Sequence, residues 1–176
     1  MEKYKKERDF EEQAFSKNKG LFLDVMGADD VVSTAYLPHH LAKIDFIGMD
    51  CIFSRGDVYR TASLRIRKDD WQNITLRGHI TEPFSQTKKI QQIISLDASY
   101  ADFTVQLNGV DHSTLTGNGS IIRVNNRLLS NHINNLHNNG ELDKYFRDFG
   151  SRGRFYEFSY SDLQRNYVLP YILKVS

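Results

Sequence analysis

The spacing of apolar side chains predicts a helix at the start of the chain and strands after it. Apolar residues recur at helical spacing within residues 5–17, and Gly20 is the predicted end of this helix. Two apolar runs with a preference for β structure follow, over 21–23 and 31–37. We therefore expect one amphipathic helix followed by short strands.

The most regular alternation of apolar and polar positions predicts a β-hairpin. Residues 42–53 and 58–67 both alternate, and the Ser-Arg-Gly-Asp sequence between them is typical of a turn. With Arg55 and Gly56 as the two loop residues, Phe53 lies opposite Val58. Opposed residues share a face of a sheet, so the apolar face of this hairpin would contain Cys51, Phe53, Val58, Ala62, Leu64 and Ile66.

The same register, carried toward the N-terminus, would place the carboxylate of Asp45 on the apolar face. One extra residue in the first strand removes this conflict, and Gly48 is the natural position for such a bulge. The corrected pairing puts Asp45 opposite Arg65. The hairpin is therefore predicted to bring an acidic and a basic side chain together.

The rest of the chain continues to alternate between the two kinds of element. We expect strands over 73–77, 100–107, 120–124 and 154–160, helices over 86–96 and 127–138, a short helix over 142–146, and a last helix from Ser161. Gly140 is the expected stop after the helix over 127–138. The predicted fold class is α/β (α+β), with a central mixed β-sheet flanked by helices in a single domain, 1–176.

Composition narrows the class of protein. Hydrophobic residues make up 40% of the 176-residue chain, which is enough to form a core and excludes wholesale disorder. The net charge of +1 excludes a uniformly basic coat but not a local basic patch. The single Cys51 excludes an intramolecular disulfide and a four-cysteine zinc site. With no apolar signal segment and no membrane-length apolar run, we expect a cytoplasmic protein that does not enter a membrane.

The order of these elements resembles that of the PD-(D/E)XK, or restriction-endonuclease-like, nuclease superfamily. In that family a helical Glu precedes an Asp on one strand and an acid-x-Lys signature on the next. Here Lys43-Ile44-Asp45-Phe46-Ile47 resembles the Asp strand, and Ser63-Leu64-Arg65 stands where the acid-x-Lys signature would be. Glu11 or Glu12 stands in the place of the helical Glu. The resemblance covers about residues 5–107 and leaves 108–176 as a C-terminal addition.

The resemblance implies metal-dependent cleavage of nucleic acid, with Mg²⁺, or Mn²⁺, held by carboxylates. Asp45 would hold the metal with Glu12 or Asp24, and the implied catalytic set is Asp45, Arg65 and Glu12. The signature is degenerate, because Ser63 replaces the acid and Arg65 replaces the Lys. Arg stays protonated and cannot act as a base, but it can neutralise a phosphate. An active nuclease and a degenerate binding relative therefore both stay open.

Plainer interpretations exist for the same residues. Asp45 and Arg65 could form an ordinary cross-strand ion pair. The acidic residues of the first helix could form only its solvated face. Asp24 could simply end a strand. The candidates for a displaced second acid, Asp69, Asp70 and Glu82, have no convincing spacing.

Two groups of basic residues are candidates for contact with DNA or RNA. Arg65, Arg67 and Lys68 lie together on and after one predicted strand, and Arg152 and Arg154 lie in a glycine-containing loop beside aromatic residues. A solvated loop is the better explanation of the second group. The alternative function is a non-enzymatic phage or mobile-element accessory protein that binds a protein partner. A homodimer is compatible with either function.

Overall fold

The computed structural model of the chain describes residues 2–33, 49–77, 101–150 and 154–175. Asp45, Gly48, Arg152 and the predicted helix over 86–96 lie outside the described residues. The helices and strands are α1 (Glu2–Lys17), α2 (Lys19–Met26), β1 (Asp30–Ser33), β2 (Cys51–Arg55), β3 (Val58–Ile66), β4 (Asn73–Arg77), β5 (Phe103–Leu107), β6 (Ser120–Asn125), α4 (Asn126–Asn138), the 3-10 helix η3 (Leu142–Tyr145), β7 (Phe146–Asp148), β8 (Arg154–Ser159), α5 (Tyr160–Arg165) and β9 (Leu173–Lys174).

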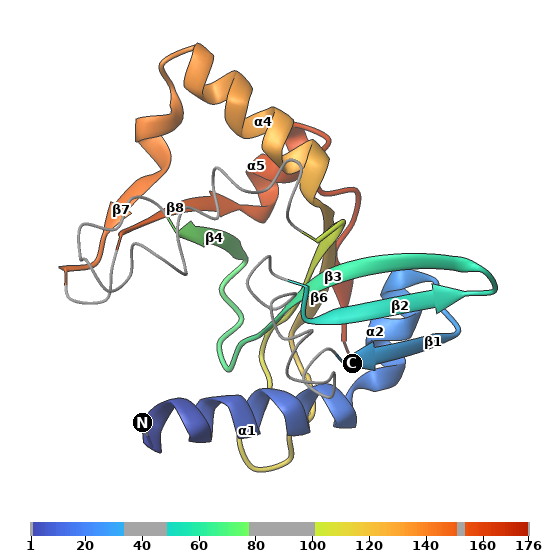
Figure 1. The fold of residues 1–176 in the computed structure, drawn as a ribbon. Coiled ribbons are helices and arrows are strands. Elements are labelled where there is room, and N and C mark those ends of the chain that lie inside the picture. The colour runs from blue at the N-terminus through green and yellow to red at the C-terminus, as the bar shows by residue number, and fades with distance from the viewer. Residues whose placement is uncertain (1, 34–48, 78–100, 151–153, 176) are drawn as a thin grey trace.

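The predicted fold class is confirmed, because the strands form a mixed sheet flanked by helices. The larger sheet has six strands in the order β1-β2-β3-β5-β6-β9, and β4, β8 and β7 form a second sheet of three. In the larger sheet β3 and β5 run parallel, whereas the other neighbours are antiparallel. Figure 1 shows α4, α5 and the smaller sheet at one end of the molecule, and α1 at the other.

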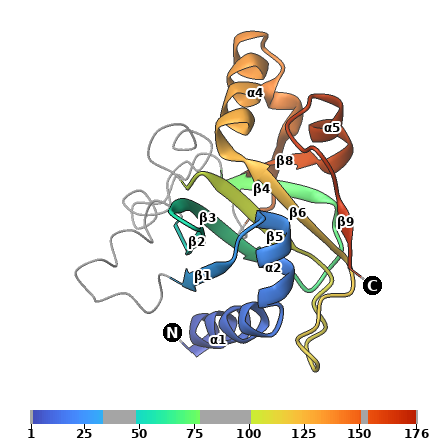
Figure 2. The same ribbon diagram turned by 90° about the vertical axis from the view of Figure 1, so that its right-hand side faces the viewer.

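The larger sheet separates two hydrophobic cores, because alternate side chains of one strand point to opposite faces. On β6, Ile121 packs in the core with α1 and α2, whereas Ile122 packs in the core with α4, α5 and the smaller sheet. The 90° view shows α2 lying across the strands of this sheet (Figure 2). Among the described residues, no helix is long and apolar enough to cross a membrane.

The first helix is confirmed and ends at Lys17, as expected, but Gly20 is not its stop. Asn18 separates α1 from α2, and α2 includes Gly20 and the run over 21–23 that we expected to be a strand. This second helix buries Phe22, Val25 and Met26 against the sheet, at spacings of three and four residues. A run of three apolar residues fits a strand or a helix face equally well, and burial against the sheet selects the helix.

The antiparallel hairpin over β2 and β3 is confirmed, whereas its predicted register is wrong. Arg55 pairs with Val58, so the loop residues are Gly56 and Asp57, and Phe53 lies opposite Arg60. Gly56 has a φ of +55°, a left-handed conformation that favours glycine. The predicted assignment of side chains to the two faces of the hairpin is still correct, because the register error shifts each pairing by two positions and side chains on the same face repeat every two residues. Cys51 and Ala62 are accordingly opposed and buried.

The later elements follow the predicted pattern with shifts at their ends. Strands β4, β5, β6 and β8 and helix α4 are found where we expected them, although β4 and β8 lie in the smaller sheet. The short helix over 142–146 is the 3-10 helix η3. Helix α5 begins at Tyr160, because Ser159 accepts a hydrogen bond from the Asp162 backbone N–H and caps it. Sequence analysis missed β7 and β9, which have three and two residues.

Candidate nucleic-acid interface

The end of strand β3 directs Arg65, and Arg67 just after the strand, to the face of the larger sheet that points away from α1 and α2. Leu64 and Ile66, the residues that alternate with them, pack on the α1–α2 side, so alternation directs the two arginines to the other side. Lys68 follows directly and is exposed. The predicted group of Arg65, Arg67 and Lys68 is therefore continuous, and it runs from a half-buried layer to the surface.

Both guanidinium groups bind to neutral acceptors on or beside β4. Arg67 donates to the side-chain oxygen of Asn73 at 2.9 Å and to the hydroxyl of Thr75 at 2.8 Å. Arg65 donates through Nη1 to the backbone carbonyl of Thr75. The other terminal nitrogen of Arg65, Nη2, is buried and has no hydrogen-bond partner. The arginines thus hold the smaller sheet against β3 and leave one buried donor unused.

Within the described part of the chain, no carboxylate forms an ion pair with Arg65 or Arg67. Burial, and then the charge of Arg65, lower the pKa of Arg67, whereas the charges of Asp69, Tyr160 and Glu157 oppose this effect. A buried cation is normally paired. An anion that entered this layer would therefore stabilise both arginines.

A layer of buried neutral polar groups continues from the arginines across β5. Gln106 and Asn108 are fully buried, and both donate to the hydroxyl of Tyr160, at 2.8 and 2.7 Å. Gln106 pairs with Arg65 in the parallel register, and its Oε1 also has no hydrogen-bond partner. Burial raises the pKa of Tyr160, against the smaller effect of the two amide donors. This network fixes α5 to the sheet beside the arginines.

Two of the predicted acidic ligands, Glu12 and Asp24, do not lie on this face. Glu12 is on α1 and the exposed Asp24 is on α2, and both helices cover the opposite side of the sheet. Among the described residues, no group of three His, Cys, Asp or Glu side chains could hold a metal ion. These residues do not form a magnesium site on their own, so the Mg²⁺ or Mn²⁺ prediction depends on Asp45 and stays a prediction.

The second basic group lies on the hairpin of β7 and β8. Arg154 pairs with Asp148 at 3.2 Å. The backbone N–H of Gly150 and then Arg154 lower the pKa of that Asp148 carboxyl. Phe149 and Phe155 approach each other beside it, with ring centroids 5.9 Å apart. Because Arg154 already has an acidic partner, it offers less free charge than Arg67 does.

Several residues of this face were missed by sequence analysis. The missed residues include three hydrogen-bond acceptors: Asn73 and Thr75, which accept from Arg67, and Tyr160, which accepts from Gln106. For Gln106, the only indication in the sequence was its polar position within the predicted strand over 100–107. Asp50 was also passed over. Its carboxylate accepts a hydrogen bond from the Leu64 backbone N–H at 2.7 Å, so it stabilises the β2–β3 pairing.

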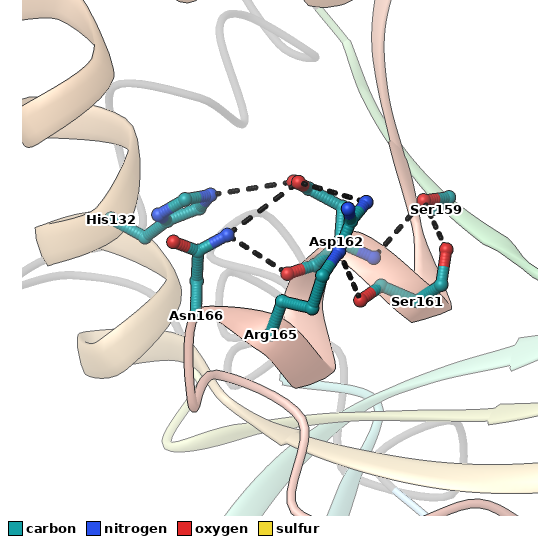
Figure 3. A network of polar contacts seen from close by, with 6 residues as sticks. All are labelled: His132, Ser159, Ser161, Asp162, Arg165 and Asn166. Carbon is teal, nitrogen blue, oxygen red and sulfur yellow. Dashed lines mark hydrogen bonds and ion pairs between the residues drawn. The ribbon is translucent and has the colours of Figure 1, made fainter.

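A separate histidine–aspartate contact joins α4 to α5 (Figure 3). Nε2 of His132 lies 3.7 Å from Oδ2 of Asp162, and the Ser159 and Ser161 hydroxyls contact each other at 3.1 Å on the far side of Asp162. A nucleophilic triad would need a serine hydroxyl on the histidine. The arrangement instead caps α5 and connects two helices.

Comparisons of this chain with protein-family models, with curated proteins and with solved structures find no match.

Proposed function

We propose that this chain is a nucleic-acid-binding protein with a nuclease-like sheet, and that Arg67, Arg65 and Lys68 contact the phosphate backbone. The observation that supports the proposal is the pair of half-buried arginines, Arg65 and Arg67, at and just after the end of β3, which have no ion-pair partner among the described residues. Burial, and then the charge of Arg65, lower the pKa of Arg67, so an oxyanion in this layer would stabilise the charged form of Arg67, and Arg is well suited to bind phosphate.

Lys68, which follows Arg67, is exposed to solvent. Its ammonium group lies 4.7 Å from the centre of the Phe10 ring, which places it at the end of β3 near α1. A nucleic-acid backbone that passed around this end of the strand would contact Lys68 on one side of the sheet and Arg67 and Arg65 on the other. Cleavage is a further step that this proposal does not require, because it depends on Asp45.

The test is fluorescence anisotropy with labelled single-stranded and double-stranded DNA and RNA over a series of salt concentrations. Counterion release makes the logarithm of affinity fall with the logarithm of salt concentration. Arg67→Gln should reduce the magnitude of this slope by about one. Arg67→Lys should retain the slope because it keeps the charge. The matched control is Arg127→Gln, an exposed position on α4, which should leave the slope unchanged.

Two outcomes would count against the proposal. The first is that none of the four nucleic-acid probes binds at low salt. The second is that Arg67→Gln and the wild-type protein show the same slope of log affinity against log salt concentration, although thermal melts show that both are folded. The same probes incubated with Mg²⁺ or Mn²⁺ report on cleavage. If Asp45 holds a metal, Asp45→Asn should abolish that cleavage, whereas binding without cleavage by the wild-type protein would support the degenerate form.

A further inference from the structure

A shallow groove lies between the end of α2 and the tip of the β2–β3 hairpin. Its volume is about 190 Å³, and it is lined by Met26, Gly27, Ala28, Phe53, Ser54, Arg55, Val58 and Arg60. Pockets for small-molecule ligands typically enclose about 300–1,000 Å³. The groove is therefore too small for such a ligand and is on the scale of one inserted side chain.

The floor of the groove is apolar and rigidly built. Phe53 is 1% exposed and Met26 is 8% exposed, so both belong to the core beneath the groove. Val58 at the hairpin tip is 50% exposed and extends this apolar surface into solvent. Gly27, which ends α2 in the left-handed conformation, turns the chain away at the edge of the groove. An apolar side chain that entered would be buried against groups already held in place.

The charged side chains that line the groove are both arginines. Arg55 and Arg60 are exposed, and alternation along the hairpin places them on the same face as Phe53. Within the described residues neither has an ion-pair partner, and Arg60 donates only to the neighbouring Tyr59 carbonyl, at 3.1 Å. Asp57, in the hairpin turn, does not line the groove. The groove therefore combines an apolar floor with an unmatched cationic rim.

We propose that this groove binds an acidic segment of a partner protein, which inserts one large apolar side chain between two or more carboxylates. The carboxylates would pair with Arg55 and Arg60, and the apolar side chain would cover Phe53 and Val58. A nucleic-acid backbone would match the two arginines but would leave the apolar floor uncovered. The proposal concerns a different face of β3 from Arg65 and Arg67 and does not depend on the proposed function.

The experiment uses three labelled peptides with the full-length chain. The first has a central phenylalanine flanked on each side by aspartates and glutamates, the second has alanine at the centre, and the third has lysines in place of the acids. We expect the first to bind at least about tenfold more tightly than either of the others, because it alone supplies both the apolar anchor and the charge complementarity. Amide signals of Gly27 and Val58 should shift in the NMR spectrum on binding.

Charge reversal at the rim tests the site directly. The double variant Arg55→Glu and Arg60→Glu should weaken binding of the first peptide by about tenfold or more, whereas Arg127→Glu on α4 should not. Both rim positions are exposed, so the fold should be retained, and thermal melts verify this. Equal binding of the phenylalanine and alanine peptides would overturn the proposal. So would insensitivity to the double variant, or displacement of the first peptide by DNA through these same arginines.

Discussion

The Tyr160 hydroxyl should make a measurable contribution to the stability of the fold, which Tyr160→Phe would remove. Tyr160 is 1% exposed, and its hydroxyl accepts hydrogen bonds from the buried amides of Gln106 and Asn108. Leaving a buried donor without an acceptor costs about 1–3 kcal/mol. The substitution therefore affects two donors at once, in the layer that connects α5 with the larger sheet.

The expected loss lies toward the lower end of that range for a structural reason. Asn108 keeps the Ser120 hydroxyl as an acceptor at 3.0 Å, and Gln106 keeps the Asn73 carbonyl at 2.9 Å. We therefore expect the free energy of unfolding to fall by about 1–2 kcal/mol. For a chain of this length that corresponds to a decrease in melting temperature of about 2–8 °C. Urea unfolding and thermal melts measure the two quantities.

The matched control is Tyr167→Phe, because the side chain of Tyr167 is 88% exposed and its hydroxyl is in solvent. That variant should stay within about 0.5 kcal/mol of the wild-type protein. If Tyr160→Phe lost no more stability than Tyr167→Phe, the reasoning about the buried network would be refuted.

The same tyrosine predicts a dependence of stability on alkaline pH. Burial raises the pKa of Tyr160 in the folded protein above its unfolded value of about 10. A group with a raised folded pKa contributes stability that is fully present below the unfolded pKa and is lost as pH rises through the folded pKa. The stability difference between the wild-type protein and Tyr160→Phe should therefore narrow above about pH 10. A difference that widened with pH would contradict this sign.

Two further predictions use the packing of single residues. Burial, and then the charge of Asp50, raise the pKa of the Cys51 thiol to about 12. The folded protein should therefore resist a thiol reagent at neutral pH and react only after unfolding. Rapid labelling of the native protein would contradict this prediction. A Cβ at Gly119 would lie 2.7 Å from the Asn108 carbonyl oxygen, so Gly119→Ala should lower the free energy of unfolding by about 1–3 kcal/mol, as measured by urea unfolding. Gly20 on α2 faces open space, so Gly20→Ala should raise the free energy of unfolding by about 0.5–1 kcal/mol. Equal effects of the two substitutions would show that the close backbone approach at Gly119 is unimportant.

The parts of the fold that were predictable are those with a local cause. Alternation along one strand decides which side chains share a face, and so Arg65 and Arg67 could be placed together without knowledge of their neighbours. The amphipathic α4 was recognised for the same reason. By contrast, the run over 21–23 is too short for its period to separate a helix from a strand, and its burial against the sheet decided the outcome.

What could not be predicted depends on contacts between distant parts of the chain. The strand over 73–77 was expected, but nothing local indicates that β4 leaves the larger sheet and pairs with β8. The acceptors that Asn73 and Thr75 offer to the arginines follow from that pairing. The hairpin register was missed because two adjacent choices of loop residues give the same faces, and the left-handed conformation of Gly56 distinguishes them only in the structure.

The two proposed binding surfaces use opposite faces of one strand, which makes them separable by experiment. Arg60 and Arg65 are five residues apart on β3, and an odd separation directs their side chains to opposite sides of the sheet. Among the described residues, the groove lining and the groups that bind Arg67 have no residue in common, so changes at the two places should have independent effects. Arg67→Gln should therefore alter the salt dependence of nucleic-acid binding without changing peptide affinity, and the double variant at Arg55 and Arg60 should do the reverse. Coupled losses from both changes would mean that a single extended ligand crosses the strand, and neither surface could then be assigned on its own.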